Sequence, residues 1–146
     1  MLMHHNILYI LCGIPASGKS TLSKQLVKQY NAKLHCFDKL PKAHHPKYYK
    51  EVRKQMHLDI ANDLRNGLDI VCDDLHTEKQ WREDILTVTK DVDCKKIIIV
   101  MTTPLEECLR RNVNREARLP DFVLYDLNEK FEPPTLDEGW DEILYF

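Results

Sequence analysis

Apolar residues along this chain fall into short continuous runs and into longer stretches in which they recur every four positions. The continuous runs cover residues 7–12, 68–72 and 96–101, and the last of these reads Lys-Ile-Ile-Ile-Val-Met. Runs that are apolar at consecutive positions indicate strands covered on both faces. Residues 32–37 form a further extended candidate, and the short apolar stretch 140–146 could add a final strand.

The stretches between these runs carry the spacing of amphipathic helices. One predicted helix spans residues 21–30, and a longer one spans residues 47–66, with Gly67 as its C-terminal cap. Thr77 caps a third predicted helix, because Thr77-Glu78-Lys79-Gln80 fits a capping box. Two more helices are expected, over residues 105–112 and after Pro120.

Strands that alternate with helices predict a parallel, doubly wound α/β sheet, which is a three-layer fold. Ligands of such sheets bind beyond the carboxyl ends of the strands. Three polar features of the sequence follow predicted strands directly: a glycine-rich loop from Gly13, then Asp38, and then Asp73 with Asp74. We therefore expect a ligand site that combines these three features.

The glycine-rich loop matches the G-x-x-x-x-G-K-[ST] phosphate loop in its required setting, between a strand and a helix. It reads Gly13-Ile14-Pro15-Ala16-Ser17-Gly18-Lys19-Ser20-Thr21. The two glycines are expected to take positive φ, so that backbone N–H groups form a concave nest for phosphate oxygens. The positive end of the following helix dipole adds to the attraction. Lys19 can reach the β- and γ-phosphates, and Ser20 can place its hydroxyl on Mg²⁺. The alternative is a tight turn that only leads into a helix.

Composition and charge limit the classes of protein to which the chain can belong. Its 146 residues suit one domain, and 43% hydrophobic with 30% charged residues is ordinary for a globular protein. A net charge of −2 gives no overall attraction to nucleic acid or to anionic membranes, although capture of a single-stranded end stays possible. The five cysteines are scattered, with no C-x-x-C pair, which disfavours a zinc site or a disulfide framework.

The first apolar run is too short to cross a bilayer, and no cationic segment precedes it. These features predict a cytoplasmic protein without membrane contact. A chain of this length also shows no added module for a protein partner. No protein partner is therefore evident from the sequence.

Two carboxylate positions are candidates for chemistry beside a bound nucleotide. Phosphoryl transfer needs a carboxylate near the acceptor hydroxyl, and Asp38 is placed to orient that hydroxyl and take its proton. The alternative is that Asp38 caps a turn before Pro41. Asp73 or Asp74 could hold magnesium through its waters or touch the substrate, and the alternative is that this pair caps the following helix.

A cluster of cations near the C-terminal third is the candidate lid. Residues 110–118 contain four arginines in nine positions, and arginine forks match phosphate oxygens bidentately. A mobile helical segment that carries them can close on ATP. The alternative is a solvated helix face balanced by Glu106, Glu107 and Glu116.

With these residues in place, the chain resembles the small P-loop kinases of the polynucleotide kinase and seryl-tRNA(Sec) kinase group over nearly its whole length. The phosphate loop is shared with many NTPases, and the C-terminal motifs are more specific. These are Thr103-Pro104, Arg110-Arg111-Asn112 with Arg115, Pro120, Phe131-Glu132-Pro133-Pro134 and Glu138-Gly139-Trp140-Asp141.

The resemblance implies an adenylate-kinase-like sheet with a small helical lid at about residues 104–134, all within one kinase domain over residues 1–146. By that resemblance Asp38 matches the general base, and Lys19 and Ser20 match the contacts to phosphate and Mg²⁺. Arg111 and then Arg115 match lid arginines, and Asp73 matches the aspartate that ends the third core strand, here a candidate metal ligand with Ser20.

Two departures from the family pattern concern the acceptor. Pro41 stands where the family often has an arginine that holds the acceptor phosphate, and Leu75-His76 stand where a Thr-Asn pair is usual. A basic and aromatic stretch could compensate by binding a strand end, or it could be a solvated helix face. Its members are Lys42, His44, His45, Lys47, Tyr48, Tyr49, Lys50, Arg53 and Lys54.

The leading hypothesis is an ATP- and Mg²⁺-dependent kinase that phosphorylates an alcohol. The expected acceptor is the 5′-hydroxyl of a polynucleotide or a related RNA, so a single-stranded nucleic-acid end is a candidate partner. A nucleoside or small metabolite is the second choice of acceptor. The alternative from another class is a P-loop ATPase or nucleotide switch that has no acceptor.

Overall fold

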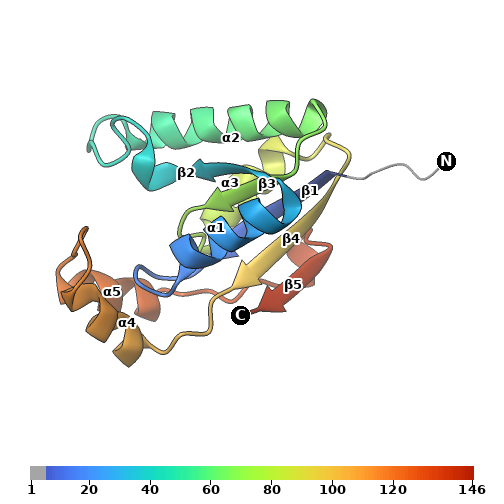
Figure 1. Ribbon diagram of the computed structural model, residues 1–146. Helices are drawn as coiled ribbons and strands as arrows, with labels where there is room; N and C mark the ends of the chain where they lie inside the picture. The colour runs from blue at the N-terminus through green and yellow to red at the C-terminus, as the bar shows by residue number, and fades with distance from the viewer. Residues whose placement is uncertain (1–5) are drawn as a thin grey trace.

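Five parallel strands form one sheet in the order β2-β3-β1-β4-β5 in the computed structural model, which describes residues 6–146 (Figure 1). The strands are β1 (Asn6–Cys12), β2 (Lys33–Cys36), β3 (Ile70–Asp73), β4 (Cys94–Val100) and β5 (Glu142–Tyr145). The parallel, doubly wound sheet predicted from the apolar runs is therefore confirmed, including a final strand from the segment 140–146. The strand predicted over residues 68–72 begins two residues later, at Ile70, and Leu68 is exposed.

Five α-helices and two short 3₁₀-helices connect the strands. The α-helices are α1 (Lys19–Tyr30), α2 (Tyr49–Arg65), α3 (Lys79–Val88), α4 (Leu105–Val113) and α5 (Asp121–Glu129). The 3₁₀-helices are η1 (Phe37–Lys39) and η2 (Leu136–Glu138). Within residues 6–146, no helix combines the length and the apolar character that a membrane crossing requires.

Alternate residues of the central strand face two different hydrophobic cores. Tyr9 and Leu11 pack with Leu22 and Leu26 of α1. On the other face, Leu8, Ile10 and Cys12 pack with residues of α2 and α3, among them Met56, Ile60, Leu64 and Ile85. This period of two along a strand between helices on both faces makes the three layers (Figure 1).

Helices α4 and α5 stand at the end of the sheet toward which the strands run (Figure 1). A third, small core holds them to the phosphate loop, because Cys108 and Leu124 pack with Ile14. The carboxamide of Asn112, which is fully buried, closes the connection between the two helices: its Nδ2 donates to the Leu119 carbonyl at 2.7 Å, and its Oδ1 accepts from the Leu119 amide at 3.1 Å.

The capping box predicted at Thr77 is wrong. Helix α3 begins at Lys79, its N-cap is Glu78 without a side-chain hydrogen bond, and the buried Thr77 hydroxyl has no partner within residues 6–146. A distant segment supplies the cap instead, since Glu132 accepts a hydrogen bond from the Lys79 amide at 3.2 Å. A capping box does form further on, between Thr135 and Glu138 at the start of η2.

Candidate active site

The register of the sheet brings the three polar strand ends together. Asp73, the last residue of β3, pairs with Leu11 of β1 on one side and with Cys36 of β2 on the other. The phosphate loop follows β1, and Asp38 follows β2 by two residues. The predicted combination of loop, Asp38 and Asp73 at one edge of the sheet is what the structure shows.

The phosphate loop takes its shape from two left-handed residues. Ala16 has φ 66° and Gly18, the N-cap of α1, has φ 100°. Alternation between right- and left-handed residues is what turns successive N–H groups toward one concavity. Helix α1 starts at Lys19, two residues earlier than predicted, so its dipole also points into the loop.

Gly13 serves a different purpose from Gly18. It is not among the residues with positive φ, so the expectation that both glycines need that conformation is wrong for this one. A Cβ at Gly13 would lie 2.7 Å from Ser17 Oγ and 2.9 Å from Met101 Cγ. Close packing of the loop against itself and against the residue after β4 therefore requires glycine here.

The ammonium group of Lys19 lies over the loop. Its Nζ donates to the carbonyls of Gly13 at 2.8 Å and Ile14 at 3.0 Å, and the side chain is 8% exposed. Burial lowers the pKa of Lys19, while Asp73 and Asp74 act to raise it. The charges that act on the ammonium thus include carboxylates at the strand ends, which favour its charged form, and Arg115, which opposes it; an anion in the loop would favour the charged form further.

A cavity of about 790 Å³ opens beside the loop. The predicted residues that line it are Ala16, Ser17, Gly18, Lys19, Ser20, Thr21, Asp38, Asp73, Arg111 and Arg115. Gly13, Ile14 and Pro15 belong to the loop but do not line the cavity. The cavity is also lined by Gln25, Met101, Thr103 and Glu107. Of these four, only two could be named from the sequence: Thr103, in the motif Thr103-Pro104, and Glu107, as a charge that balances the arginines.

Asp38 lies in η1 with its carboxylate mostly in solvent, its side chain being 61% exposed. The turn it occupies is closed by backbone, since the Leu40 amide donates to the Phe37 carbonyl at 3.0 Å, and no side chain caps η1. The alternative of a turn-capping Asp38 is therefore wrong. Its carboxylate instead contacts Nε2 of the exposed His44 at 3.1 Å.

The two aspartates that end β3 have separate environments. Asp73 is 7% exposed, lines the cavity and makes no side-chain hydrogen bond within residues 6–146. Burial raises its pKa, although Lys19 lowers it. The Asp74 carboxylate accepts from Arg53 and from the Leu75 amide, and these contacts together with His76 hold its pKa below the usual value despite burial.

Neither aspartate caps the next helix, because α3 begins only at Lys79. Asp73 is the one that lines the cavity, whereas Asp74 is held by Arg53 and the Leu75 amide. Within residues 6–146 no group of three or more His, Cys, Asp or Glu side chains is arranged around a metal position. Mg²⁺ does not need such a group, since it keeps several waters and uses one or two protein oxygens with substrate phosphates. Ser20 and Asp73, both on the cavity wall, fit that requirement.

The predicted lid arginines divide into two groups. Arg111 and Arg115 line the cavity, and the buried Nη1 of Arg115 has no hydrogen-bond partner within residues 6–146. Arg110 does not line the cavity; it is exposed and pairs with Glu107. Glu107 also accepts from Arg111 Nε at 3.0 Å, and the two arginines lower the pKa of Glu107 to about 2. Whether the α4–α5 pair closes as a lid stays a prediction.

Thr103 fixes the start of the α4 segment to the phosphate loop. Its Oγ1 donates to the Ser17 carbonyl at 2.8 Å. This hydrogen bond ties the segment just before α4 directly to the phosphate loop. The motif Thr103-Pro104 is recognisable in the sequence, but the role of the Thr103 hydroxyl is evident only from its contact with the phosphate loop.

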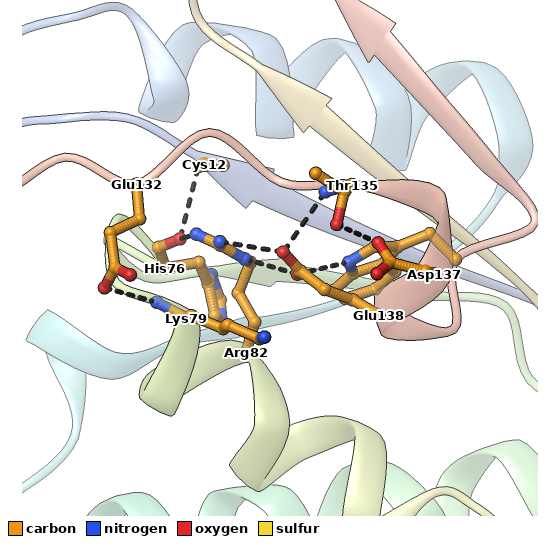
Figure 2. A network of polar contacts seen from close by, with 9 residues as sticks. Cys12, His76, Lys79, Arg82, Glu132, Thr135, Asp137 and Glu138 are labelled. Atoms are coloured by element: carbon orange, nitrogen blue, oxygen red, sulfur yellow. Dashed lines mark hydrogen bonds and ion pairs between the residues drawn. The ribbon is translucent and has the colours of Figure 1, made fainter.

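A buried polar network supports the other side of the loop (Figure 2). Leu75 accepts a hydrogen bond from the Gly13 amide at 3.0 Å, and the ring of His76 contacts the Leu11 carbonyl through Nδ1 at 2.8 Å. The fully buried Arg82 donates to the His76 carbonyl at 2.9 Å and, through Nε and Nη2, to both carboxylate oxygens of Glu138. Leu75-His76, the departure from the family pattern, is thus where the loop meets the C-terminal segment.

Comparison with known proteins identifies the family of this chain. Residues 7–145 match the family described as chromatin associated protein KTI12. The chain belongs to this family. The motifs of the sequence indicate the polynucleotide kinase and seryl-tRNA(Sec) kinase group; an L-seryl-tRNA(Sec) kinase is among the curated relatives, and an RNA repair complex is among the solved structures that share the fold.

Two curated relatives cover nearly the whole chain. An L-seryl-tRNA(Sec) kinase of Methanococcus maripaludis is 29% identical over 143 residues, 92% of this chain and 56% of the relative. Protein kti12 of Schizosaccharomyces pombe is 25% identical over 156 aligned positions, 94% of this chain and 56% of the relative. The chain therefore spans about half the length of the curated relatives that it matches.

Solved structures share the fold. The Pnkp1/Rnl/Hen1 RNA repair complex aligns with a TM-score of 0.73 and 20% identity, over 90% of this chain and 48% of that one. Chaetomium thermophilum Kti12 in complex with ADP-AlF3 aligns with a TM-score of 0.69 and 17% identity, over 95% and 88%. A fungal RNA kinase aligns with a TM-score of 0.73 and 16% identity, over 98% and 38%. The fold is that of the P-loop kinases.

Proposed function

We propose that this protein binds ATP with Mg²⁺ in the cavity beside the phosphate loop and transfers the γ-phosphate to an alcohol. The observation that carries the proposal is the composition of this one cavity. It combines Lys19 and Ser20 of the loop, the buried Asp73, the exposed Asp38, and two arginines from the α4 segment. Each group has a use in phosphoryl transfer, and each comes from a different part of the chain.

The donor half of the reaction rests on the loop and the arginines. Loop N–H groups and Lys19 bind the phosphate oxygens, and Lys19 exchanges its carbonyl contacts at Gly13 and Ile14 for them. Arg115 Nη1, which is buried and has no hydrogen-bond partner within residues 6–146, is available to an anionic oxygen, and Arg111 lines the same cavity. Ser20 and Asp73 would hold Mg²⁺, which offsets charge on the phosphates when bound. These groups stabilise the charge that develops during in-line transfer.

The acceptor half rests on Asp38. Its exposed carboxylate can reach a hydroxyl that enters from solvent, orient it and accept its proton as the new P–O bond forms. The contact with His44 is compatible with this role, because both side chains are open to water and free to separate. The expected acceptor is the 5′-hydroxyl of a polynucleotide or a related RNA. The named relatives support that class, since they include an L-seryl-tRNA(Sec) kinase and an RNA repair complex.

A second candidate function is a P-loop ATPase or nucleotide switch without an acceptor. The observation in its favour is the solvent exposure of the Asp38 carboxylate. A carboxylate that can accept a proton from an alcohol can also accept one from a water molecule that attacks the γ-phosphate. A nucleoside or small metabolite is the further alternative among acceptors.

The test is incubation with γ-labelled ATP and Mg²⁺ in the presence of 5′-hydroxyl oligonucleotides, tRNA, nucleosides and sugars. Labelled acceptor is the result that the kinase proposal requires. Free phosphate without any labelled acceptor would favour the ATPase. Lys19→Ala should abolish turnover and weaken ATP binding, and Lys24→Ala, an exposed lysine on the same helix, is the matched control. Asp38→Asn should lose transfer while ATP affinity is kept; full transfer by this variant would refute the assignment of the base.

A further inference from the structure

A second pocket, of about 670 Å³, lies between α2 and α3, on the opposite face of the sheet from α1. Its size is within the range of small-molecule and cofactor sites. From α2 it is lined by Tyr49, Lys50, Arg53, Lys54 and His57, and from α3 by Gln80, Trp81, Asp84, Thr87 and Val88. The loop residues and carboxylates of the candidate active site are not part of it.

His57 is part of this pocket and carries an unused polar atom. It is only 2% exposed, and its Nε2 makes no hydrogen bond within residues 6–146. Burial lowers the pKa of His57 to about 4, so the ring is neutral at neutral pH. Buried polar groups are normally paired. His57 lines the pocket, and its buried, unpaired Nε2 is a hydrogen-bonding position that a ligand bound there could use.

Aromatic and cationic side chains line other parts of this pocket. Trp81 and Tyr49 supply aromatic surface. Lys50 and Lys54 stand one helical turn apart, both exposed, and neither forms an ion pair with another of the residues 6–146. Opposite them, Asp84 accepts a hydrogen bond from Gln80 Nε2 at 3.2 Å. Aromatic faces with neighbouring cations are what single-stranded nucleic acids need, since bases stack on the rings and phosphates pair with the cations.

Arg53 connects this pocket with the candidate active site. It lines the pocket, and its guanidinium Cζ lies 5.9 Å from the Trp81 ring centroid. On its other side the same group hydrogen-bonds Asp74, the neighbour of Asp73, and stacks at 3.9 Å on Phe37, the neighbour of Asp38. Arg53 therefore contacts both this pocket and the two segments that carry Asp73 and Asp38.

We propose that the α2–α3 pocket binds a nucleobase of a single-stranded nucleic acid, which stacks on Trp81 and hydrogen-bonds His57 while its phosphates pair with Lys50 and Lys54. As an acceptor subsite it rests on the proposed function, but binding at the pocket does not require phosphoryl transfer. The pocket assigns a use to part of the basic and aromatic stretch noted in the sequence. Within that stretch, Lys42 and Lys47 are placed differently, since they lie over the Tyr48 ring at 4.8 Å and 5.5 Å.

The test is the affinity of the protein for a labelled single-stranded 5′-hydroxyl oligoribonucleotide, measured by fluorescence anisotropy without ATP. Base stacking on an aromatic side chain contributes about 1–3 kcal/mol, so Trp81→Ala should weaken binding by about fivefold to 150-fold. The double variant Lys50→Ala with Lys54→Ala should weaken it and reduce its dependence on salt. The matched controls are Phe122→Ala, an exposed aromatic residue on α5, and Lys24→Ala with Lys28→Ala, an exposed pair at the same spacing on α1.

Equal affinity for the pocket variants and their controls would overturn the proposal, as would the absence of oligonucleotide binding. If Trp81→Ala fails to fold, Trp81→Phe, which keeps a stacking surface, and the lysine pair decide the matter. Binding that depends on the pocket without any transfer from ATP would leave this site standing and remove the kinase proposal. Transfer to a small alcohol without oligonucleotide binding would do the reverse.

Discussion

Arg53 of α2 holds Asp74, the residue directly after β3, with two hydrogen bonds, from Nε to Oδ2 at 2.7 Å and from Nη2 to Oδ1 at 3.1 Å. The face of the same guanidinium lies 3.9 Å from the centroid of Phe37, the first residue of η1. One side chain thus joins a helix, the segment that carries Asp73 and the segment that carries Asp38. We therefore expect this contact to help set the relative position of Asp38 and Asp73.

Replacement of Arg53 by Met should therefore affect both stability and phosphoryl transfer. It leaves the Asp74 carboxylate buried without its partner, and removal of one member of a buried pair costs about 3–5 kcal/mol. The free energy of unfolding from urea titration measures this loss. Arg53→Lys should recover only part of it, because lysine lacks the planar fork.

The matched control is Arg65→Met, an exposed arginine at the end of the same helix, which should change stability by less than about 0.5 kcal/mol. In single-turnover assays of whichever transfer the acceptor panel reveals, Arg53→Met should lower the rate while ATP affinity is kept. An unchanged rate would show that Arg53 does not position Asp38.

The Arg82–Glu138 pair should be the strongest link between α3 and the C-terminal segment. The side chain of Arg82 is fully buried and that of Glu138 is 4% exposed. Glu138→Gln should therefore cost about 3 kcal/mol or more of unfolding free energy, because it leaves the guanidinium without a countercharge. Glu142→Gln, which removes the partner of Lys95 in an exposed pair, should cost less than about 1 kcal/mol. Equal losses from the two variants would contradict this interpretation of the network in Figure 2.

The sheet and the position of the site could be predicted from the sequence because both depend on local patterns. Apolar runs such as residues 96–101 identify buried strands, and the carboxyl ends of parallel strands meet at one edge whatever the details of packing. The order of Gly13, Asp38 and Asp73 along the chain was therefore enough to expect them together.

What could not be predicted depends on contacts between distant segments. Thr77 has the local pattern of a cap, but Glu132, more than fifty residues away, occupies the position that a cap would take. Arg53 lies in a basic stretch that looks solvated, yet Asp74 and Phe37 draw it inward. No spacing within the sequence identifies such partners, since their proximity exists only after the layers have assembled.

The buried His57 should make the protein less stable below neutral pH. Burial and the charges of His76 and Arg53 lower its pKa from 6.5 to about 4, although Asp74 and Asp84 oppose this shift. Below pH 6.5 His57 becomes protonated in the unfolded state, whereas in the folded state it stays neutral down to about pH 4. The contribution of His57 to the free energy of unfolding is therefore fully present above pH 6.5. This contribution is lost as pH falls toward about 4, by roughly 3 kcal/mol in all.

Urea titrations between pH 7 and pH 4 measure this slope. Between pH 7 and pH 4 the unfolding free energy of His57→Gln should fall by roughly 3 kcal/mol less than that of the parent protein. His45→Gln, a change at an exposed position, should show the same dependence of unfolding free energy on pH as the parent protein. An identical slope for His57→Gln would mean that other groups, with the buried His76 foremost among them, account for the acid sensitivity.

Removal of the charge of Asp73 and removal of the charge of Asp74 should change the stability of the protein in opposite directions. Burial raises the pKa of Asp73, so its ionised form destabilises the folded state, and this cost grows as pH rises through the folded pKa. Asp73→Asn should accordingly raise the melting temperature of the ligand-free protein at pH 7. The pKa of Asp74 is lowered, so its ionised form stabilises the fold, and Asp74→Asn should cost about 2 kcal/mol through weakened charge-assisted hydrogen bonds.

The ligand reverses the first of these effects. A cation held by Ser20 and Asp73 favours the carboxylate, so the rise in melting temperature on addition of ATP with Mg²⁺ should be smaller in Asp73→Asn than in the parent protein. The rise with ATP in the presence of EDTA should differ little between the two. Thermal denaturation under these conditions separates the contributions. A variant that is less stable without ligand, or that keeps the full Mg²⁺-dependent rise, would show that Asp73 is a structural residue and not part of the metal site.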